Sequence, residues 1–465
     1  MLKQKLSGSD NLNKNLKSVF TLPGPKGKFI VGNAIDFGQN PLGFMTQCAQ
    51  QYGEIIPLHL GNSPTIVLTN PNDIEPVLKD RELFVKAKAL KSLHALLGNG
   101  LLVSEGDSWF RQRRLAQPVF HQKRISSYGE VMVDYTNNML DTWRDGETRD
   151  INADIMRLTF NIVMKTLFSS DVTEEQADDV AQAMSVAAEW FLARRKSPFS
   201  LPEQFPTPSN LRYKYAVEQM DKHIYQIIQQ RRTSGEESLD LLSMMMQARD
   251  EDDGSQMSDK QLRDEIATLI FAGHETSANT LAWTWMLLSQ YPEVQTKLQQ
   301  ELKEVLGDRS LTVADLPALH YTNMVIKESM RLYPVVWNMV SETSRDCEIG
   351  GYHVPAGCTI IMSQWVMHRS DRYFEQPETF NPERWAGDLE KQLPRGVYVP
   401  FGGGPRICIG RSFALMETVL LLATIAQKFD MSLVPGQSIV PQPTITLQPQ
   451  NGIKVVVKQR RNQPN

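Results

Sequence analysis

Cysteine is scarce in this chain of 465 residues, which contains only 4 cysteines, Cys48, Cys347, Cys358 and Cys408. So few cysteines do not make a disulfide framework, and no two of them form the C-x-x-C pair of a zinc site or a redox dithiol. The sequence therefore favours a reducing, intracellular compartment. Lone cysteines are most often buried and inert, and we expect this of Cys48, Cys347 and Cys358.

Long hydrophobic runs are also lacking. The most apolar stretches, Leu281–Leu288 and Thr418–Ala426, are shorter than the roughly 18 residues that cross a bilayer, so they indicate buried helix segments. Residues 1–20 are polar, carry several lysines and lack the apolar core of a signal peptide. We expect a loose N-terminal tail at 1–20 and no transmembrane anchor.

Neither sign of charge dominates, because 49 basic and 53 acidic residues leave a formal charge of −4. A nucleic-acid binder relies on a strongly basic surface, so that class of protein is disfavoured.

No internal repeat and no linker rich in Pro, Gly or Ser divides the chain. Helical periodicity and β-type runs alternate along it. The helical patterns occupy 85–335 and 405–430, and the β-type runs occupy 50–80, 335–365 and 435–458. The predicted fold class is mainly α with a smaller β-rich part, in one domain from 21 to 465.

Three shorter segments have a distinctive composition. Residues 55–69 hold two β-type runs around a Gly-Asn turn, which predicts a hairpin. Ser197–Asn210 contains four prolines, which exclude a continuous helix. It is either a packed surface connection, or a mobile lid or a patch that touches a membrane. We interpret the acidic run Asp250–Asp253 as a solvated loop.

The most informative segment is residues 401–410, Phe-Gly-Gly-Gly-Pro-Arg-Ile-Cys-Ile-Gly, which places Cys408 in a glycine-rich turn before an apolar helix. Glycine lets a backbone lie close to a bulky planar ligand. The N–H groups and positive dipole end of the helix favour a thiolate at Cys408. Arg406 can reach an anionic group at the ligand's edge as a permanently charged fork.

This segment resembles the haem-binding signature of the cytochrome P-450 family of haem-thiolate monooxygenases. The resemblance extends over nearly the whole chain and is strongest to soluble bacterial members that hydroxylate fatty acids. It implies the cytochrome P-450 fold, a triangular α-helical body that encloses haem b, with Cys408 as the ligand of the iron. It assigns haem contacts to Phe401, Gly402, Gly404, Arg406 and Gly410.

The family places a proton-delivery pair on a long central helix. Ala272-Gly273-His274-Glu275-Thr276 matches its pattern, within a helix predicted from Asp264 to Ser289. The hydroxyl of Thr276 is placed to bond the carbonyl of Ala272 one turn back, which can bend a helix and admit water. Gly273 leaves room for a small ligand. The resemblance thus assigns the catalytic positions to Ala272, Gly273, Glu275 and Thr276.

A further family pattern is a buried Glu-x-x-Arg pair joined by a later arginine. Glu328 and Arg331 stand three residues apart, on one helical face, and Arg384 supplies the third member. Such a network costs desolvation but fixes one geometry, so the resemblance implies a structural brace.

The family's Trp-x-x-x-Arg, whose side chains donate to the haem propionates, is matched by Trp109 and Arg113. The spacing places both on one helical face. Lys86 is a further propionate candidate. Several members have an arginine near 338, where this chain has Asn338.

Substrate contacts follow from the family's pocket-lining segments, and the matching positions are almost wholly apolar, which implies a hydrophobic substrate. They are Leu101, Leu102, Ala272, Val335, Val336, Trp337 and Ile445. Soluble fatty-acid hydroxylases hold the carboxylate with an Arg and a Tyr, but Asn62 and Ile66 stand at those places. A fatty acid, terpenoid, alkane or carotenoid substrate therefore stays open.

The implied reaction inserts one oxygen atom of O2 into a C–H bond. Electrons from NAD(P)H would arrive through a separate ferredoxin or flavodoxin and its reductase, since no flavin or iron–sulfur motif is present.

We expect a monomeric, cytoplasmic bacterial protein with possible peripheral membrane contact. The alternatives are a peroxygenase or peroxide-rearranging enzyme, which usually lacks the acid–Thr pair, and a non-catalytic haem sensor.

A basic cluster could steer the acidic redox partner, and its alternative is an ordinary solvated helical surface. The cluster comprises Arg111, Arg113, Arg114, Lys123, Arg124 and Arg411.

Overall fold

The computed structural model describes residues 16–169, 174–196, 201–234 and 240–460. They divide into two compact units, each described by itself below. The sheet unit comprises the chain up to Ala89 with Asn338–Tyr373 and Leu393–Ile407, and the helical unit comprises Leu90–Trp337, Phe374–Gln392 and the chain from Cys408. Most of the predicted N-terminal tail lies outside the described residues.

The sheet unit is built on five strands in the order β1-β2-β8-β5-β3, of which only the β2–β8 pair is parallel. The predicted hairpin is confirmed, because β1 and β2 pair directly up to Leu60 and Ser63, with Gly61 in the left-handed region at φ 63°. The strands are β1 Ile55–Leu60, β2 Ser63–Leu68, β3 Phe84–Lys86, β5 Met339–Thr343 and β8 Thr359–Met362, with the separate pair β6 Cys347–Ile349 and β7 Tyr352–Val354.

Short helices complete the sheet unit and begin at residues suited to a helix start. Prolines stand at the first positions of α2 and α3, where a missing N–H costs little. The helices are α1 Ala34–Gln39, α2 Pro41–Tyr52, α3 Pro71–Lys79 and α15 Gln364–Met367, with 3₁₀ turns at Val19–Thr21 and Gly404–Arg406.

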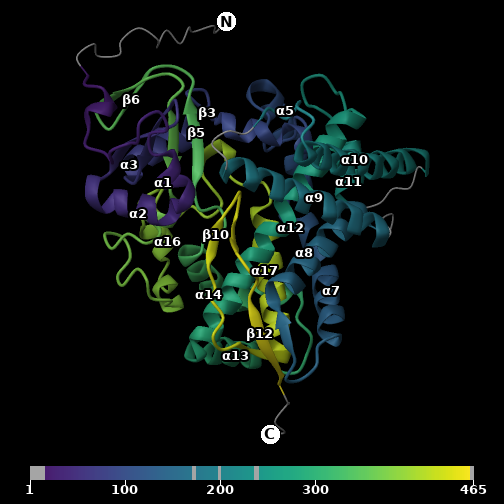
Figure 1. Cartoon of the computed structure of the whole chain (residues 1–465). Helices are drawn as coiled ribbons and strands as arrows, with labels where there is room; N and C mark the ends of the chain where they lie inside the picture. Colours follow the sequence, from purple (N-terminus) through teal and green to yellow (C-terminus); the bar gives the residue numbers. More distant parts are fainter. Residues whose placement is uncertain (1–15, 170–173, 197–200, 235–239, 461–465) are drawn as a thin grey trace, which may run out of the picture. The chain divides into compact units, whose positions relative to one another are not determined.

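Helices dominate the other unit (Figure 1). The first group is α4 His94–Leu97, α5 Gly106–Ala116, α6 Gln122–Ile125, α7 Gly129–Asp141, α8 Ile151–Phe168, α9 Glu174–Lys196, α10 Pro208–Ser234 and α11 Leu241–Gln247. The second group is α12 Asp259–Gln290, α13 Pro292–Leu306, α14 His320–Leu332, α16 Leu389–Gln392 and α17 Arg411–Lys428. Further 3₁₀ turns lie at Gln117–Phe120, Ser126–Tyr128, Val313–Ala318 and Pro382–Trp385, and another, Lys88–Leu93, crosses from the sheet unit into this one.

Two small sheets accompany these helices. One has the order β4-β12-β9 and the other is the hairpin β10-β11. Their strands are β4 Thr148–Asp150, β9 Phe429–Leu433, β10 Pro441–Pro443, β11 Leu447–Pro449 and β12 Lys454–Gln459. Helices thus prevail, and the predicted fold class is confirmed. The strands β3, β4 and β9 lie outside the predicted β-rich stretches, and β4 falls within the stretch predicted as helical.

Helix α12 runs through the core of the helical unit and packs along α8 (Figure 1). It begins five residues before the predicted Asp264, because Ser258 caps it: its hydroxyl accepts from the N–H of Gln261, whose side chain accepts from the N–H of Ser258. Leu281–Leu288 is buried, as predicted, and so is Thr418–Ala426 in α17. A helix apolar around most of its circumference belongs in a core.

The described part of the proline-rich loop folds back on its neighbours, which supports the packed connection. The side-chain amide of Asn210 donates to the carbonyls of Pro202 (3.1 Å) and Phe205 (2.9 Å). The side chains of Leu201 and Phe205 are nonetheless about half exposed. Residues 197–200 lie outside the described residues.

The interpretation of Asp250–Asp253 as a solvated loop is wrong for Asp250. Its carboxylate is buried and pairs with Arg111 (3.2 Å) and Arg114 (2.5 Å) of α5. The loop is therefore anchored to that helix by a buried charge.

Candidate active site

Cys408 differs from the other three cysteines in its surroundings. All four are free thiols, but Cys48, Cys347 and Cys358 are buried and only Cys408 is exposed. Burial raises the pKa of Cys48 and Cys347 to about 11 and that of Cys358 to about 12. These three are inert thiols, as expected, whereas Cys408 is accessible to a ligand.

The groups around Cys408 act on its pKa in opposite directions, and burial, the larger effect, leaves that pKa above its ordinary value. The protein packed about it raises the pKa of Cys408, while the N–H of Gly410 and the guanidiniums of Arg113 and Arg411 lower it. Gly410 is the cap residue of α17, so the donated N–H belongs to the start of that helix, as predicted. A sulfur with these neighbours is suited to bind a metal ion as a thiolate.

The part of the signature before Cys408 belongs to the sheet unit. Gly404 has φ 63°, and a Cβ there would lie 2.0 Å from the carbonyl oxygen of Leu78. Gly404 is thus required by its backbone conformation and by close packing on α3, a reason that the sequence did not reveal. Gly402 also has a positive φ, 71°, and Phe401 is half-buried.

Arg406 and Lys86, the predicted propionate partners in the sheet unit, lie in different environments. The guanidinium of Arg406 donates from Nη1 to the carbonyl of Phe84 (2.7 Å) and from Nη2 to that of Arg81 (3.2 Å). Lys86 ends β3 and is half-exposed. The arginine is therefore held in one orientation by the backbone before and within β3.

Trp109 and Arg113 lie on α5 in the helical unit, one turn apart as predicted. Trp109 is buried and Arg113 is half-buried. Burial lowers the pKa of Arg113, and the charge of Cys408 raises it, so α5 brings this cation near the thiol. Arg113 and Cys408 are thus close in space, although they are almost 300 residues apart in the sequence.

Away from its two ends, helix α12 is accessible at a few positions near its middle. Between Leu262 and Leu288 the residues that are not buried are Leu269, Ala272, Gly273, Glu275 and Thr276. Positions three, four and seven apart share a helical face. Four of the five are the predicted catalytic positions, so the predicted motif coincides with the accessible part of the core helix.

The predicted hydrogen bond within this motif is present: Oγ1 of Thr276 donates to the carbonyl of Ala272 at 2.8 Å. Gly273 has a packing reason as well, since a Cβ there would lie 3.2 Å from Cγ2 of Val163 on α8. His274 points into the core and is bonded through Nδ1 to the carbonyl of Ile270 at 2.7 Å. Burial lowers the pKa of His274, which is therefore neutral near pH 7.

Sequence reasoning missed the partner of Glu275. Its Oε1 accepts a hydrogen bond from the hydroxyl of Thr446, which lies between β10 and β11. No local spacing signals this contact, because the two residues are 171 positions apart.

The brace of Glu328, Arg331 and Arg384 forms as predicted. Arg331 donates to both carboxylate oxygens of Glu328 at 2.8 Å, and Nε of Arg384 donates to Oε1 at 3.0 Å. The sequence did not reveal that Trp385 also donates to Glu328, from Nε1 to Oε2 at 2.8 Å. Arg331 further donates to the carbonyls of Pro377 and Thr379. The network is buried and fully engaged, which is the condition under which such charges are tolerated.

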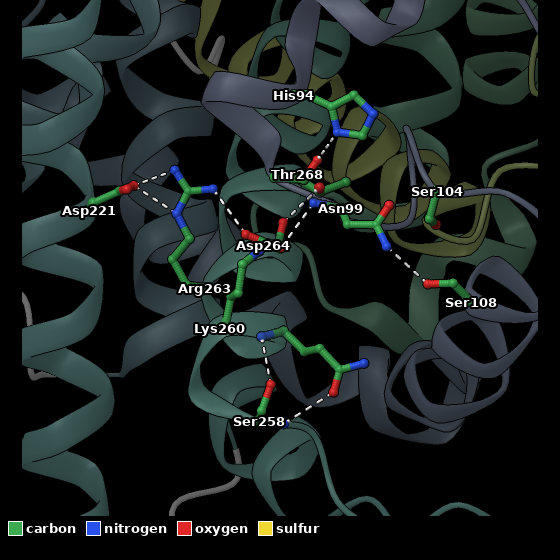
Figure 2. A network of polar contacts seen from close by, with 12 residues as sticks. His94, Asn99, Ser104, Ser108, Asp221, Ser258, Lys260, Arg263, Asp264 and Thr268 are labelled. Atoms are coloured by element: carbon green, nitrogen blue, oxygen red, sulfur yellow. Dashed lines mark hydrogen bonds and ion pairs between the residues drawn. The ribbon is translucent and has the colours of Figure 1, made fainter.

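Two acidic side chains on α12 hold the loop that carries Leu101 and Leu102, and Figure 2 shows the first of them, Asp264, beside Asn99. The Asp264 carboxylate accepts from the N–H of Asn99 (2.9 Å), and Glu265 accepts from that of Leu101 (3.1 Å). Asp264 also pairs with Lys260 (3.0 Å) and Arg263 (3.1 Å). These tertiary contacts fix the loop backbone and were not predicted.

A second group of predicted substrate contacts meets at the β10–β11 turn. The N–H of Leu447 donates to the carbonyl of Val335 (2.8 Å), and Nε1 of Trp337 donates to that of Thr444 (3.1 Å). Val335 and Trp337 are buried, Val336 is exposed, and Ile445 is half-buried in the turn itself. Hydrogen bonds thus connect the segment 335–337 to the β10–β11 turn, and these apolar side chains lie at that connection.

The predicted basic face is partly neutralised. Arg111 and Arg114 pair with Asp250, and Arg114 also pairs with Asp252 at 2.7 Å. Arg411 lies 3.5 Å from Glu390. Lys123 and Arg124 are exposed on α6.

The residues present fit a haem group. An accessible thiol next to a helix start, a nearby guanidinium, and the exposed face of an otherwise buried helix are what a planar, anionic, iron-bearing ligand requires. This fold and this donor set define a haem-thiolate enzyme.

The comparisons with known proteins agree. The Cytochrome P450 family model matches residues 22–457. Cyclooctat-9-en-7-ol 5-monooxygenase of Streptomyces melanosporofaciens is 36% identical over 410 residues, which cover 88% of this chain and 89% of that protein. Pentalenene oxygenase of Streptomyces avermitilis is 31% identical, covering 89% and 91% of the two chains. The crystal structure of the cytochrome P450DA haem domain superposes with a TM-score of 0.85 at 25% identity, over 95% of this chain and 97% of that one.

The chain belongs to the cytochrome P450 family and is a monooxygenase, an oxidoreductase with a haem-thiolate cofactor. Among the helices that the structure describes, none combines the length and the apolarity that crossing a membrane requires.

Proposed function

We propose that this cytochrome P450 hydroxylates a hydrophobic terpenoid, using O2 and electrons that a separate ferredoxin or flavodoxin and its reductase carry from NAD(P)H. The observation that carries the proposal is the apolar character of the candidate contacts at Leu101, Val335, Trp337 and Ile445, together with the acid and hydroxyl on the accessible face of α12. Bound haem supplies the activation of O2 and the attack on the C–H bond.

The protein's own contributions in this proposal are ligation, anchoring and proton supply. Cys408 would hold the haem iron through its sulfur as a thiolate. Arg113, Trp109 and Arg406 hold the cofactor, whose propionates are anionic, through charge-assisted hydrogen bonds. Thr276 and Glu275 hold and exchange protons at the accessible face of α12, where a hydroxyl beside the carbonyl of Ala272 can pass a proton onward.

The terpenoid assignment has two supports. The relatives described above act, by their names, on cyclooctat-9-en-7-ol and on pentalenene. In addition, the positions that match the carboxylate anchor of fatty-acid hydroxylases carry no charge: Ile66 is fully buried in β2, and Asn62 stands in the β1–β2 turn. A free fatty acid would leave its carboxylate without a cationic partner there.

The proposed docking site of the redox partner is inferred from the positive charges that are exposed on α6. Lys123 and Arg124 are exposed, while Arg111 and Arg114 are paired with Asp250. We assign the docking of an acidic partner to Lys123 and Arg124, whose attraction weakens with salt. Lys123→Glu with Arg124→Glu should slow reduction by ferredoxin at low ionic strength and have little effect at high ionic strength.

The substrate is tested by binding spectra of the purified holoenzyme with cyclic terpenoids, alkanes, carotenoids and free fatty acids. We expect cyclic terpenoids at micromolar concentration to change the absorption spectrum of the holoenzyme in the manner of a spin-state change. A stronger response to free fatty acids would contradict the terpenoid assignment. Turnover with peroxide and none with O2 and reduced ferredoxin would contradict the monooxygenase mechanism.

A further inference from the structure

Glu275 is oriented by a residue outside its own helix. Its Oε1 accepts from the hydroxyl of Thr446, in the turn between β10 and β11. Thr446 is 5% exposed, whereas Glu275 lies on the accessible face of α12. The carboxylate thus has a fixed donor at Oε1, on a side chain that is half-buried.

The hydroxyl of Thr446 is also held by a chain of two side-chain amides, one of them on α12 and the other on α8. Nδ2 of Asn152 donates to Oδ1 of Asn279 at 3.1 Å, and Nδ2 of Asn279 donates to Oγ1 of Thr446 at 3.3 Å. The hydroxyl oxygen of Thr446 thus accepts from Asn279, and its O–H donates to Glu275, whose ionised carboxylate can only accept. Asn279 is fully buried, one turn after Glu275 on the same helical face.

The turn that carries Thr446 is itself held on both sides. Nε1 of Trp283 on α12 donates to the carbonyl of Leu447 at 3.0 Å, and Oγ1 of Thr444 donates to that of Thr446 at 2.8 Å. The contacts of Val335 and Trp337 described above add two further bonds to the same turn. A donor fixed in this way orders the carboxylate with little further loss of side-chain freedom.

We propose that Thr446 is a positioning residue, which holds the Glu275 carboxylate in the orientation that exchanges protons with the accessible face of α12. The inference rests on the proposed proton-delivery role of Glu275. Ile445, a candidate substrate contact, precedes Thr446 in the same turn, so substrate contact and carboxylate orientation share one structural element.

The test compares holoenzyme variants in a reaction with O2 and a surrogate ferredoxin system, and measures the share of electrons released as hydrogen peroxide. Thr446→Val removes the hydroxyl and keeps the side-chain shape. We expect the ratio of peroxide to product to rise about three- to tenfold, in line with the loss of one hydrogen bond. Thr446→Ser should restore the wild-type ratio. Thr136→Val is the matched control, because Thr136 is a buried threonine on α7 that donates only to a backbone carbonyl.

Two further measurements separate positioning from a general structural role. The dissociation constant of the substrate, from binding spectra, should stay within about twofold in Thr446→Val, because the apolar contacts are unchanged. In thermal melts, the Tm shifts of Thr446→Val and Glu275→Ala should be non-additive, since the two side chains share one bond. Should Thr446→Val fail to accumulate as folded protein, Thr446→Ala removes the same hydroxyl with less bulk.

Glu275→Gln distinguishes this inference from the proposed function. If Glu275→Gln raises the peroxide share and Thr446→Val does not, the positioning role is wrong and the proton-delivery role stands. If neither variant raises the peroxide share, both are wrong. Additive Tm shifts would likewise overturn the positioning role.

Discussion

The guanidinium of Arg331 and the carboxylate of Glu328 meet in two parallel hydrogen bonds of 2.8 Å, and both side chains are 0% exposed. This pair lies on α14 and ties it to the segment 377–385 through Arg384 and Trp385. Because its charges are buried and paired, we expect this brace to contribute to stability.

Glu328→Gln should therefore destabilise the protein strongly, because it leaves buried guanidiniums without a counter-charge, at a cost of about 3–5 kcal/mol. The free energy of unfolding from denaturant titration measures this loss. Glu383→Gln is the matched control, since Glu383 pairs with Lys297 at the surface and should cost less than about 1 kcal/mol. Equal losses of unfolding free energy in Glu328→Gln and Glu383→Gln would contradict the claim that burial of the Glu328–Arg331 pair determines its contribution to stability.

Replacement of Cys408 should abolish the thiolate-type spectrum of the reduced protein with carbon monoxide. Cys408→Ala removes the only exposed sulfur among the four cysteines, and no other thiol is in a position to replace it. The control is Cys358→Ala, which should keep the spectrum because Cys358 is buried and its pKa is raised to about 12. An unchanged spectrum in Cys408→Ala would refute the ligand assignment.

Thr276→Ala should leave that spectrum intact but divert electrons from product into peroxide. Because general acid catalysis contributes ~10²–10⁴-fold, we expect product per NAD(P)H consumed to fall at least about tenfold. Thr280→Ala is the matched control for Thr276→Ala. Thr280 lies one turn further on in α12, and its hydroxyl donates to the carbonyl of Thr276 at 2.9 Å. Equal coupling in Thr276→Ala and wild type would refute the role of Thr276.

Glu417 predicts a pH dependence of stability. This carboxyl on α17 is fully buried, and burial raises its pKa to about 8, while the hydroxyl of Ser277 on α12 lowers it. Between the unfolded pKa of about 4.3 and about 8, the native state keeps a proton that the unfolded state has lost, so this group makes stability fall as pH rises.

Glu417→Gln removes this titration. Relative to wild type, the variant should gain stability from pH 5 to pH 9, by up to about 5 kcal/mol if the full shift is expressed. Thermal melts at several pH values measure the difference. Glu304→Gln, at an exposed position on α13, should show no such trend. A difference between Glu417→Gln and wild type that does not change with pH would contradict the raised pKa.

Asp264 should control the rigidity of the loop that begins at Gly98. Gly98 has φ 53°, and a Cβ there would lie 1.9 Å from Oδ1 of Asp264, so the loop is packed directly on the carboxylate. In Asp264→Ala the amide of Asn99 loses its acceptor, and its protection from hydrogen exchange should fall about tenfold, the equivalent of one charge-assisted hydrogen bond.

The amide of Leu101, which donates to Glu265, provides the internal comparison because its acceptor is retained. Lys260→Gln should have a much smaller effect, since the side chain of Lys260 is 72% exposed. Unaltered exchange at Asn99 in Asp264→Ala would show that the loop is held by other contacts.

What could be predicted from the sequence was local. The pairs Glu328–Arg331, Ala272–Thr276 and Trp109–Arg113 are three or four residues apart, and helix geometry alone places such residues on one face. The helix ends shifted by a few residues because caps such as Ser258 are decided by side-chain hydrogen bonds.

What the sequence could not reveal was the tertiary partner of a charged or polar group. The contacts of Thr446 with Glu275, of Asp264 with Asn99, and of Asp250 with Arg114 join segments more than 100 residues apart, and no periodicity encodes them. Gly404 is a related case, since its need for glycine comes from the carbonyl of Leu78 in α3. These residues become informative only once the chain is folded.

The central claim, an O2-dependent haem-thiolate monooxygenase acting on a terpenoid, is tested most directly by isotope incorporation. The holoenzyme is supplied with ¹⁸O2, NAD(P)H, a surrogate ferredoxin and reductase, and a cyclic terpenoid that changes its spin state. Mass spectrometry should find one ¹⁸O atom in the hydroxylated product, and none when the label is in water. Product that carries oxygen from water, or product that forms only when peroxide is added, would contradict the account.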